Sequence, residues 1–313
     1  MAEITAGMVK DLREKTGVGM MDCKAALAAT NGDMDAAVDW LRAKGLAKAA
    51  KKSTRVAAEG LVGVAVSGTT GAAVEVNSET DFVARNAKFQ AMVAGITRLA
   101  LDAGGSTEKL KTMKFPGSQH AVAEYVAEMV VTIGENLTVR RSAALSVKEG
   151  VIGSYVHNQA APGMGKIGVL VALESAGSKD ELAHFGRMLA MHVAATNPVS
   201  MDISGVPKET LARERAILEE KNAGKPANVL EKIIASGLKT YAKENCLLEQ
   251  VYVHDAAKTV TQAIAEAANK VGAAIKLSGY VRMQLGEGID KKDDDFAAEV
   301  AKAAGQGAPE IKV

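Results

Sequence analysis

The sequence predicts an α+β protein built from more than one compact unit, and three observations carry this prediction. At 313 residues, 48% of them apolar and 24% charged, the chain is long enough for about two hydrophobic cores. Aromatic residues make up only 4%, while alanine is abundant and there are 30 glycines, which favours helices and tight turns over a large β-sandwich. Short strand patterns followed by helical patterns also occur twice, with Gly60 and Gly150 at matching places.

The first 55 residues predict a small unit of three helices and a linker. Thr5 is a suitable N-cap for the first helix, and Met20 to Ala29 predict the second. Asp33 can cap the third helix, whose apolar residues recur at i, i+3, i+4 and i+7 until Gly45, where we expect it to end. The basic stretch 44–55 is interpreted as a solvated linker or as an extension of this helix.

The middle of the chain predicts two related α+β units, 56–145 and 146–206 with 246–286. Each begins with two strands joined by a turn and continues through a helix to a second helix and a final strand, so each should form a small antiparallel sheet covered by helices. The predicted segments are 56–63, 71–76, 89–101, 122–133 and 137–142 in the first copy, and 148–153, 168–173, 182–195, 260–271 and 275–285 in the second.

The second copy contains an insertion, 207–245, that predicts an antiparallel helical hairpin. Two charged helical patterns flank the turn residues Ala223 to Pro226. Whether this hairpin is a surface decoration or a contact surface is left open by the sequence. The last module, 287–313, predicts an amphipathic helix from Asp290 to Ala304 and a frayed tail.

Charge and cysteine content limit the possible partners and location. The net charge of +1 provides no global field for nucleic acid, and the basic stretch 44–55 lacks aromatic residues for base stacking, so no direct nucleic-acid contact is expected. Cys23 and Cys246 are too few for a disulfide framework, and no apolar run is long enough to span a bilayer. We therefore expect a cytoplasmic protein that does not enter a membrane.

The candidate motifs for cofactor binding or catalysis are incomplete. Gly163 to Gly168 has the letters of a dinucleotide fingerprint, but it runs directly into a strand pattern where the fingerprint requires a helix. Ile167 follows Lys166 where a phosphate loop needs Ser or Thr. The five histidines lack metal-ligand spacing, and Cys23 is interpreted as a small buried side chain. We predict no catalytic residue, no metal and no cofactor.

The segment Asn77 to Ala84 is unusual because small polar residues between a strand and a helix are followed by Phe82, one of five phenylalanines. In one interpretation, Thr80 or Asp81 caps the following helix and Phe82 packs into the core. In the other, the turn presents Phe82 at a protruding corner as an anchor for a partner. The residues alone do not separate these interpretations.

Two long strings resemble a known family. EVNSETDFVARNAKF, residues 75–89, resembles a signature of the bacterial translation elongation factor Ts family, and LREKTGVGMMDCKAAL, residues 12–27, resembles its amino-terminal signature. The resemblance continues through Ile133 to Asn136, Gly153 to His157 and Gly286 to Ile289. It implies a ubiquitin-associated-like (UBA-like) three-helix domain, a duplicated α+β core, an inserted coiled-coil hairpin and a C-terminal helix.

The resemblance also implies a function, namely guanine-nucleotide exchange on elongation factor Tu without any bond being made or broken. In this family's mechanism Thr80, Asp81, Phe82 and Val83 reach the partner's GTPase domain, where Phe82 disturbs the magnesium site. The resemblance assigns the other partner contacts to Arg13, Met20, Met21, Lys24, Ile133, Gly134 and His157. Self-association through the hairpin is a further expectation. The alternative is a UBA-like adaptor that binds RNA or protein without exchange activity.

Overall fold

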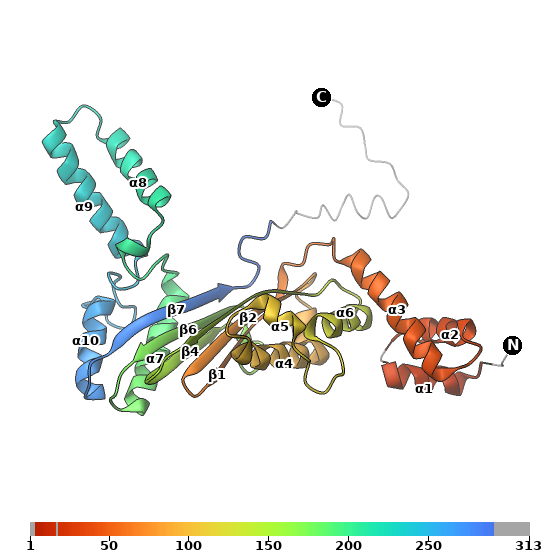
Figure 1. Ribbon diagram of the computed structural model, residues 1–313. Coiled ribbons are helices and arrows are strands. Elements are labelled where there is room, and N and C mark those ends of the chain that lie inside the picture. Colours follow the sequence, from red (N-terminus) through yellow and green to blue (C-terminus); the bar gives the residue numbers. More distant parts are fainter. Residues whose placement is uncertain (1–3, 17, 291–313) are drawn as a thin grey trace, which may run out of the picture.

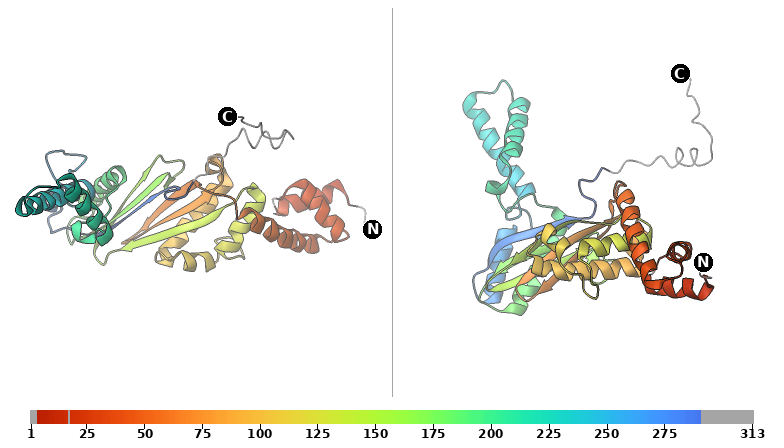
Figure 2. Two further views of the ribbon diagram at one scale, coloured as in Figure 1. Left: turned by 90° about the horizontal axis from the view of Figure 1, so that it is seen from above. Right: turned by 45° about the vertical axis from the view of Figure 1, so that its right-hand side comes forward.

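The computed structural model describes residues 4–16 and 18–290. A small helical unit lies at one end of the molecule, two packed sheets with their helices form the body, and a helical hairpin projects from the opposite end (Figures 1 and 2). Within the described ranges no helix is both long and apolar enough to cross a membrane.

The N-terminal unit contains the three predicted helices, α1 (Ala6–Thr16), α2 (Met20–Ala29) and α3 (Met34–Lys52). Asp33 caps α3 as expected, since its carboxylate accepts a hydrogen bond of 2.9 Å from the Ala36 N–H. Leu12, Cys23 and Leu27 are fully buried between the helices. The interpretation of Cys23 as a small core residue is therefore confirmed.

The prediction that Gly45 ends the third helix is wrong, because α3 continues to Lys52. A Cβ on Gly45 would lie 3.1 Å from Val131 Cγ2 on the neighbouring helix. The glycine thus permits close packing of two helices, and the alanines and lysines that follow it are good helix formers. The basic stretch is an extension of the helix that docks on the body.

The first copy of the repeat forms the sheet β3-β2-β1, in which neighbouring strands are antiparallel. Its strands are β1 (Glu59–Ser67), β2 (Thr70–Ser78) and β3 (Thr138–Ser146), and its helices are α4 (Ala87–Ala103), α5 (Thr107–Thr112) and α6 (Val122–Ile133). Helix α6 has the predicted bounds, whereas α5, capped by Ser106, was not predicted because it is only six residues long.

The second copy forms the sheet β4-β6-β7, again antiparallel and with the second strand of the copy in the centre. Its strands are β4 (Gly150–His157), β6 (Ile167–Glu174) and β7 (Lys276–Gln284), and its helices are α7 (Lys179–Thr196) and α10 (Val260–Val271). The shared order of the two sheets agrees with the duplication inferred from the sequence.

The two sheets pack face to face, and each carries its helices on its outer face (Figure 1). Side chains alternate along each strand, so Val62 and Ala73 meet Leu170 and Ala172 between the sheets. Their strand neighbours, such as Leu61 and Val74, pack beneath α4 and α6. The body is therefore a four-layer arrangement of helices, sheet, sheet and helices.

The glycine-rich segment begins in the hairpin loop that joins the antiparallel strands β4 and β6. This loop also contributes a two-residue strand, β5 (Met164–Gly165), that pairs with β1 and becomes the fourth strand of the first sheet. This pairing depends on how the two copies pack together, so the local sequence pattern could not predict it.

The insertion forms the expected antiparallel hairpin of α8 (Lys208–Lys221) and α9 (Ala227–Asn245). The two helices approach closely where a Cβ on Gly237 would lie 2.5 Å from Leu218 Cδ1, and Arg215 Nη2 lies 2.6 Å from Glu231 Oε1. The predicted C-terminal helix lies outside the described residues from position 291 onward.

Candidate functional site

The segment after β2 forms a tight corner, the Phe82 turn, which we define as residues 79–82. It is followed by one turn of 3-10 helix, Val83–Arg85. Phe82 is 78% exposed, whereas Val83 is only 5% exposed and packs in the first core. The chain thus anchors the turn through Val83 and presents the aromatic ring of Phe82 to solvent.

This geometry decides between the two sequence interpretations of Phe82. The N-cap of α4 is Asn86, whose side-chain oxygen accepts hydrogen bonds of 2.9 and 3.2 Å from the backbone N–H groups of Lys88 and Phe89. Neither Thr80 nor Asp81 caps this helix, and the core aromatic is Phe89, which is fully buried. The packing interpretation of Phe82 is therefore wrong, and the protruding-corner interpretation fits.

Hydrogen bonds hold the Phe82 turn against a second turn, residues 134–136, which we name the Glu135 turn. The Glu135 carboxylate accepts 2.9 Å from the Thr80 N–H and 2.6 Å from the Thr80 hydroxyl. Gly134 ends α6 with a φ of 93°, a conformation that favours glycine, and is exposed. Ile133 is partly buried against the first core.

A second group of predicted site residues lies on the N-terminal unit. Met20 and Met21 are 51% and 79% exposed, and Arg13 and Lys24 are also exposed. Arg13 and Met20 line an open cleft together with Lys88, at the start of the helix that follows the Phe82 turn. The structure therefore brings part of this patch to the same side of the molecule as the base of the Phe82 turn.

His157 is the predicted residue that the structure leaves apart from these two groups. It is exposed at the end of β4, where its Nδ1 lies 3.1 Å from the Tyr155 hydroxyl. Its nearest polar partner thus belongs to its own strand.

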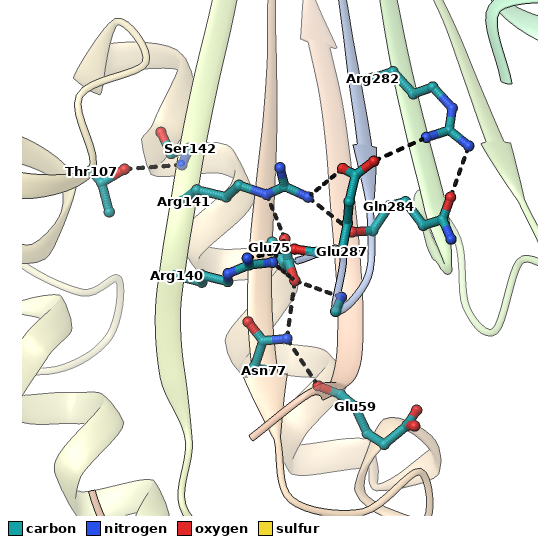
Figure 3. Close-up of polar contacts among 11 residues, drawn as sticks. Glu59, Glu75, Asn77, Thr107, Arg140, Arg141, Ser142, Arg282, Gln284 and Glu287 are labelled. Carbon is teal, nitrogen blue, oxygen red and sulfur yellow. Dashed lines mark hydrogen bonds and ion pairs between the residues drawn. The ribbon is translucent and has the colours of Figure 1, made fainter. Parts of the chain in front are cut away.

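A buried charge cluster between the two sheets was missed by the sequence reasoning (Figure 3). Glu75 is fully buried in β2 and forms ion pairs of 3.0 Å with Arg140 Nη1 and 2.6 Å with Arg141 Nε. It also accepts a hydrogen bond of 2.8 Å from the Gly286 N–H, and Arg140 donates 2.6 Å to the Glu287 carbonyl. The cluster ties the end of β7 to the first sheet.

The carboxyl of Glu75 remains charged despite its burial. Burial alone raises its pKa, but the hydrogen bonds from the Gly286 N–H, the Asn77 amide and the two guanidinium groups outweigh this and lower the pKa below the usual 4.5. A glutamate within a run of buried strand residues, and an adjacent pair of arginines in another strand, were the sequence signals that could have predicted this pairing.

The glycines of the 163–168 segment lead into β5 and β6 and not into a helix N-terminus, as the sequence argument expected. In the described part of the chain no group of three or more His, Cys, Asp or Glu side chains is arranged to hold a metal ion.

Comparison with known proteins identifies the family. A sequence profile described as Elongation factor TS matches residues 79–287, about two thirds of the chain. The chain belongs to the elongation factor Ts family.

Full-length relatives agree with this assignment. Proteins named Elongation factor Ts from Xanthobacter autotrophicus and Azorhizobium caulinodans are each 60% identical over 306 residues, which cover 98% of this chain and 100% of the relative. One from Methylobacterium nodulans is 61% identical over 305 residues, covering 97% and 99% of the two chains.

Membership in the elongation factor Ts family makes this chain a translation elongation factor of the guanine-nucleotide exchange class. The matched region begins at Glu79, the first residue of the Phe82 turn, and ends at Glu287, which the Glu75 cluster holds.

Proposed function

We propose that this chain accelerates GDP release from elongation factor Tu by inserting Phe82 beside the partner's nucleotide site. The observation that carries the proposal is the 78% exposure of Phe82 on a turn fixed by a buried Val83 and by the Glu135 carboxylate. An exposed aromatic ring on a rigid support loses little conformational entropy when it enters a pocket. Phe82 therefore has the properties of an anchor residue at a protein–protein interface.

The proposed mechanism makes no covalent bond and acts only on the stability of the nucleotide complex. A complex of nanomolar affinity stores about 12 kcal/mol, and each tenfold faster release requires about 1.4 kcal/mol of stabilisation of the opened state. A buried aromatic anchor contributes about 2 to 4 kcal/mol, which corresponds to more than one power of ten in rate. The contacts of Phe82 are therefore strong enough to increase the rate of GDP release more than tenfold.

Within this proposal, Phe82 displaces the partner's switch helix and disturbs the magnesium ion that bridges the phosphates. Loss of the ion removes positive charge from the phosphates and weakens the bound GDP. Thr80 and Asp81 extend the same contact surface. Val83 is buried, so its role is to hold the turn and not to touch the partner.

Other contacts follow from the remaining predicted residues. The N-terminal unit carries an exposed patch of two methionines and two cations, namely Met20, Met21, Arg13 and Lys24. Flexible methionines suit a contact that adapts to its partner, and the cations suit an acidic partner surface. We assign this patch to docking on another helix of the GTPase domain. Gly134 and Ile133 support the turn from below, and His157 is a more distant contact.

The domain organisation is proposed along the same lines. The N-terminal unit, 1–55, serves as a UBA-like docking module, and the hairpin, 207–245, as a coiled coil that is available for self-association. Exposed Ile217 and Val229 on the hairpin support this assignment. The setting proposed for the exchange is the cytoplasm.

The experiment that tests the function is release of a fluorescent GDP analogue from elongation factor Tu, in the presence of excess GDP and increasing amounts of this protein. We expect the release rate to increase with the concentration of this protein and to saturate. A rate that is the same with and without the protein would contradict the proposal.

A further inference from the structure

We propose that Glu135 is a positioning residue for nucleotide exchange, which clamps the Phe82 turn through Thr80. The proposal rests on the proposed function, since it concerns how the free protein prepares the turn for its partner. It adds a residue of the Glu135 turn that acts on Phe82 through Thr80.

The clamp is reciprocal, because each turn supplies a carboxylate to the backbone of the other. Glu135 accepts hydrogen bonds of 2.9 Å from the Thr80 N–H and 2.6 Å from the Thr80 hydroxyl. Glu79 accepts 2.5 Å from the Asn136 N–H. The two turns are 55 residues apart in sequence, so only the tertiary packing of the first copy brings them together.

The end of α3 and the residues directly after it hold the clamp from a third side. Arg55 lies 3.3 Å from the Glu79 carboxylate, and its carbonyl accepts 2.7 Å from the side-chain amide of Asn136, which is buried. Lys52 donates to the Gly134 carbonyl. The Glu135 turn is thereby also held by the end of α3 and the segment that follows it.

The position of Thr80 determines what the clamp controls. Thr80 lies two residues before Phe82, and its carbonyl accepts 2.9 Å from the Ser78 hydroxyl at the end of β2. Val83 fixes the turn on its other side. Between these points Phe82 is 78% exposed and has little packing of its own, so the hydrogen bonds of Glu135 help to define where the ring points. A carboxylate suits this task, because charge-assisted hydrogen bonds are stronger than neutral ones.

The first test measures the clamp in the free protein, independently of exchange. Amide hydrogen exchange of residues 79–83 is compared in the wild type, Glu135→Ala, Glu135→Gln and the control Glu108→Gln. Glu108 is an exposed carboxylate that pairs with Lys111 at 3.0 Å on α5. We expect about tenfold faster exchange in Glu135→Ala, a smaller change in Glu135→Gln because its amide oxygen still accepts one hydrogen bond, and no change in the control.

The second test measures GDP release from elongation factor Tu as a function of the concentration of each variant. We expect Glu135→Ala to lower the maximal release rate about tenfold, which is the loss of about 1.4 kcal/mol, with partial rescue in Glu135→Gln. Combining Glu135→Ala with Phe82→Ala should give a protein no slower than Phe82→Ala alone, because both changes remove the same positioned ring.

The outcomes separate the clamp from the function. Unchanged hydrogen exchange in Glu135→Ala, a full tenfold further loss in the double variant, or normal release despite a loosened turn each overturns the positioning role. If the wild type itself fails to accelerate release, the proposed function is wrong, while the hydrogen-exchange result still decides whether Glu135 holds the turn.

Discussion

Replacing Phe82 with alanine should reduce exchange strongly while leaving the fold nearly intact. Because Phe82 is 78% exposed, only about one fifth of its surface is covered in the free protein. Full burial of a phenylalanine contributes about 1.5 to 3 kcal/mol, so the truncation should cost roughly 0.5 kcal/mol of unfolding free energy. In a chain of this size that lowers the melting temperature by about 1 to 2 °C.

Phe89→Ala is the matched control, since it changes the same residue type seven positions further along. Phe89 lies on α4 and is fully buried in the first core, so its truncation should cost about 3 to 5 kcal/mol and lower the melting temperature by roughly 10 °C. Exchange per folded molecule should nevertheless stay near the wild-type rate, because the surface that bears Phe82 is unchanged.

The assay measures thermal unfolding and release of a fluorescent GDP analogue on the same preparations. An aromatic anchor worth at least 2 kcal/mol in the complex predicts that elongation factor Tu releases GDP at least about 30 times more slowly with Phe82→Ala than with the wild type. Loss of several kcal/mol of stability in Phe82→Ala, or GDP release as fast as with the wild type, would refute the role of Phe82 as an exposed anchor.

Three further predictions concern the rest of the molecule. Glu75→Gln should lower the unfolding free energy by about 3 to 5 kcal/mol at neutral pH, because it leaves two arginines without their buried partner. Since folding lowers the pKa of Glu75, the stabilisation by its carboxylate is present above pH 4.5 and is lost as the pH falls through the lowered pKa. Urea denaturation should therefore show the unfolding free energies of the wild type and the variant converging in acid. Replacing 215–237 by a short Gly-Ser linker should leave GDP release near the full-length rate, because this distal part of the hairpin packs on itself, and complete loss of exchange would contradict that placement. Calorimetry should detect no stoichiometric binding of GDP to the protein alone, since the glycines of 163–168 lead into strands, and a saturable heat signal would show that a nucleotide site had been missed.

Much of the architecture could be predicted from sequence because it depends on local rules. Helix α6 and helix α10 have the bounds that the apolar periodicity predicted, and Asp33 caps α3 as its position suggested. Period, capping and turn chemistry act within a few residues, so a linear sequence contains them. The matching order of the two sheets likewise follows from the repeat, since similar segments form similar units.

The tertiary structure decided what depends on residues far apart in the chain. The end of α3 differs from the prediction because Gly45 packs against Val131, 86 positions away. Strand β5 pairs with the other copy of the repeat, and the Glu75 carboxylate is held by groups from β3 and from the end of β7. Local propensity contains no information about such contacts.

The Phe82 turn depends both on local sequence and on contacts between distant residues. The sequence by itself determined that small polar residues and a rare aromatic interrupt the chain between a strand and a helix. Only the tertiary structure decided that Val83 faces the core while Phe82 faces solvent, because that choice depends on Asn86 capping α4 and on Glu135 reaching Thr80 from another turn. Burial is a property of the packed chain, so an aromatic residue in a turn becomes core or surface only when its distant neighbours are in place.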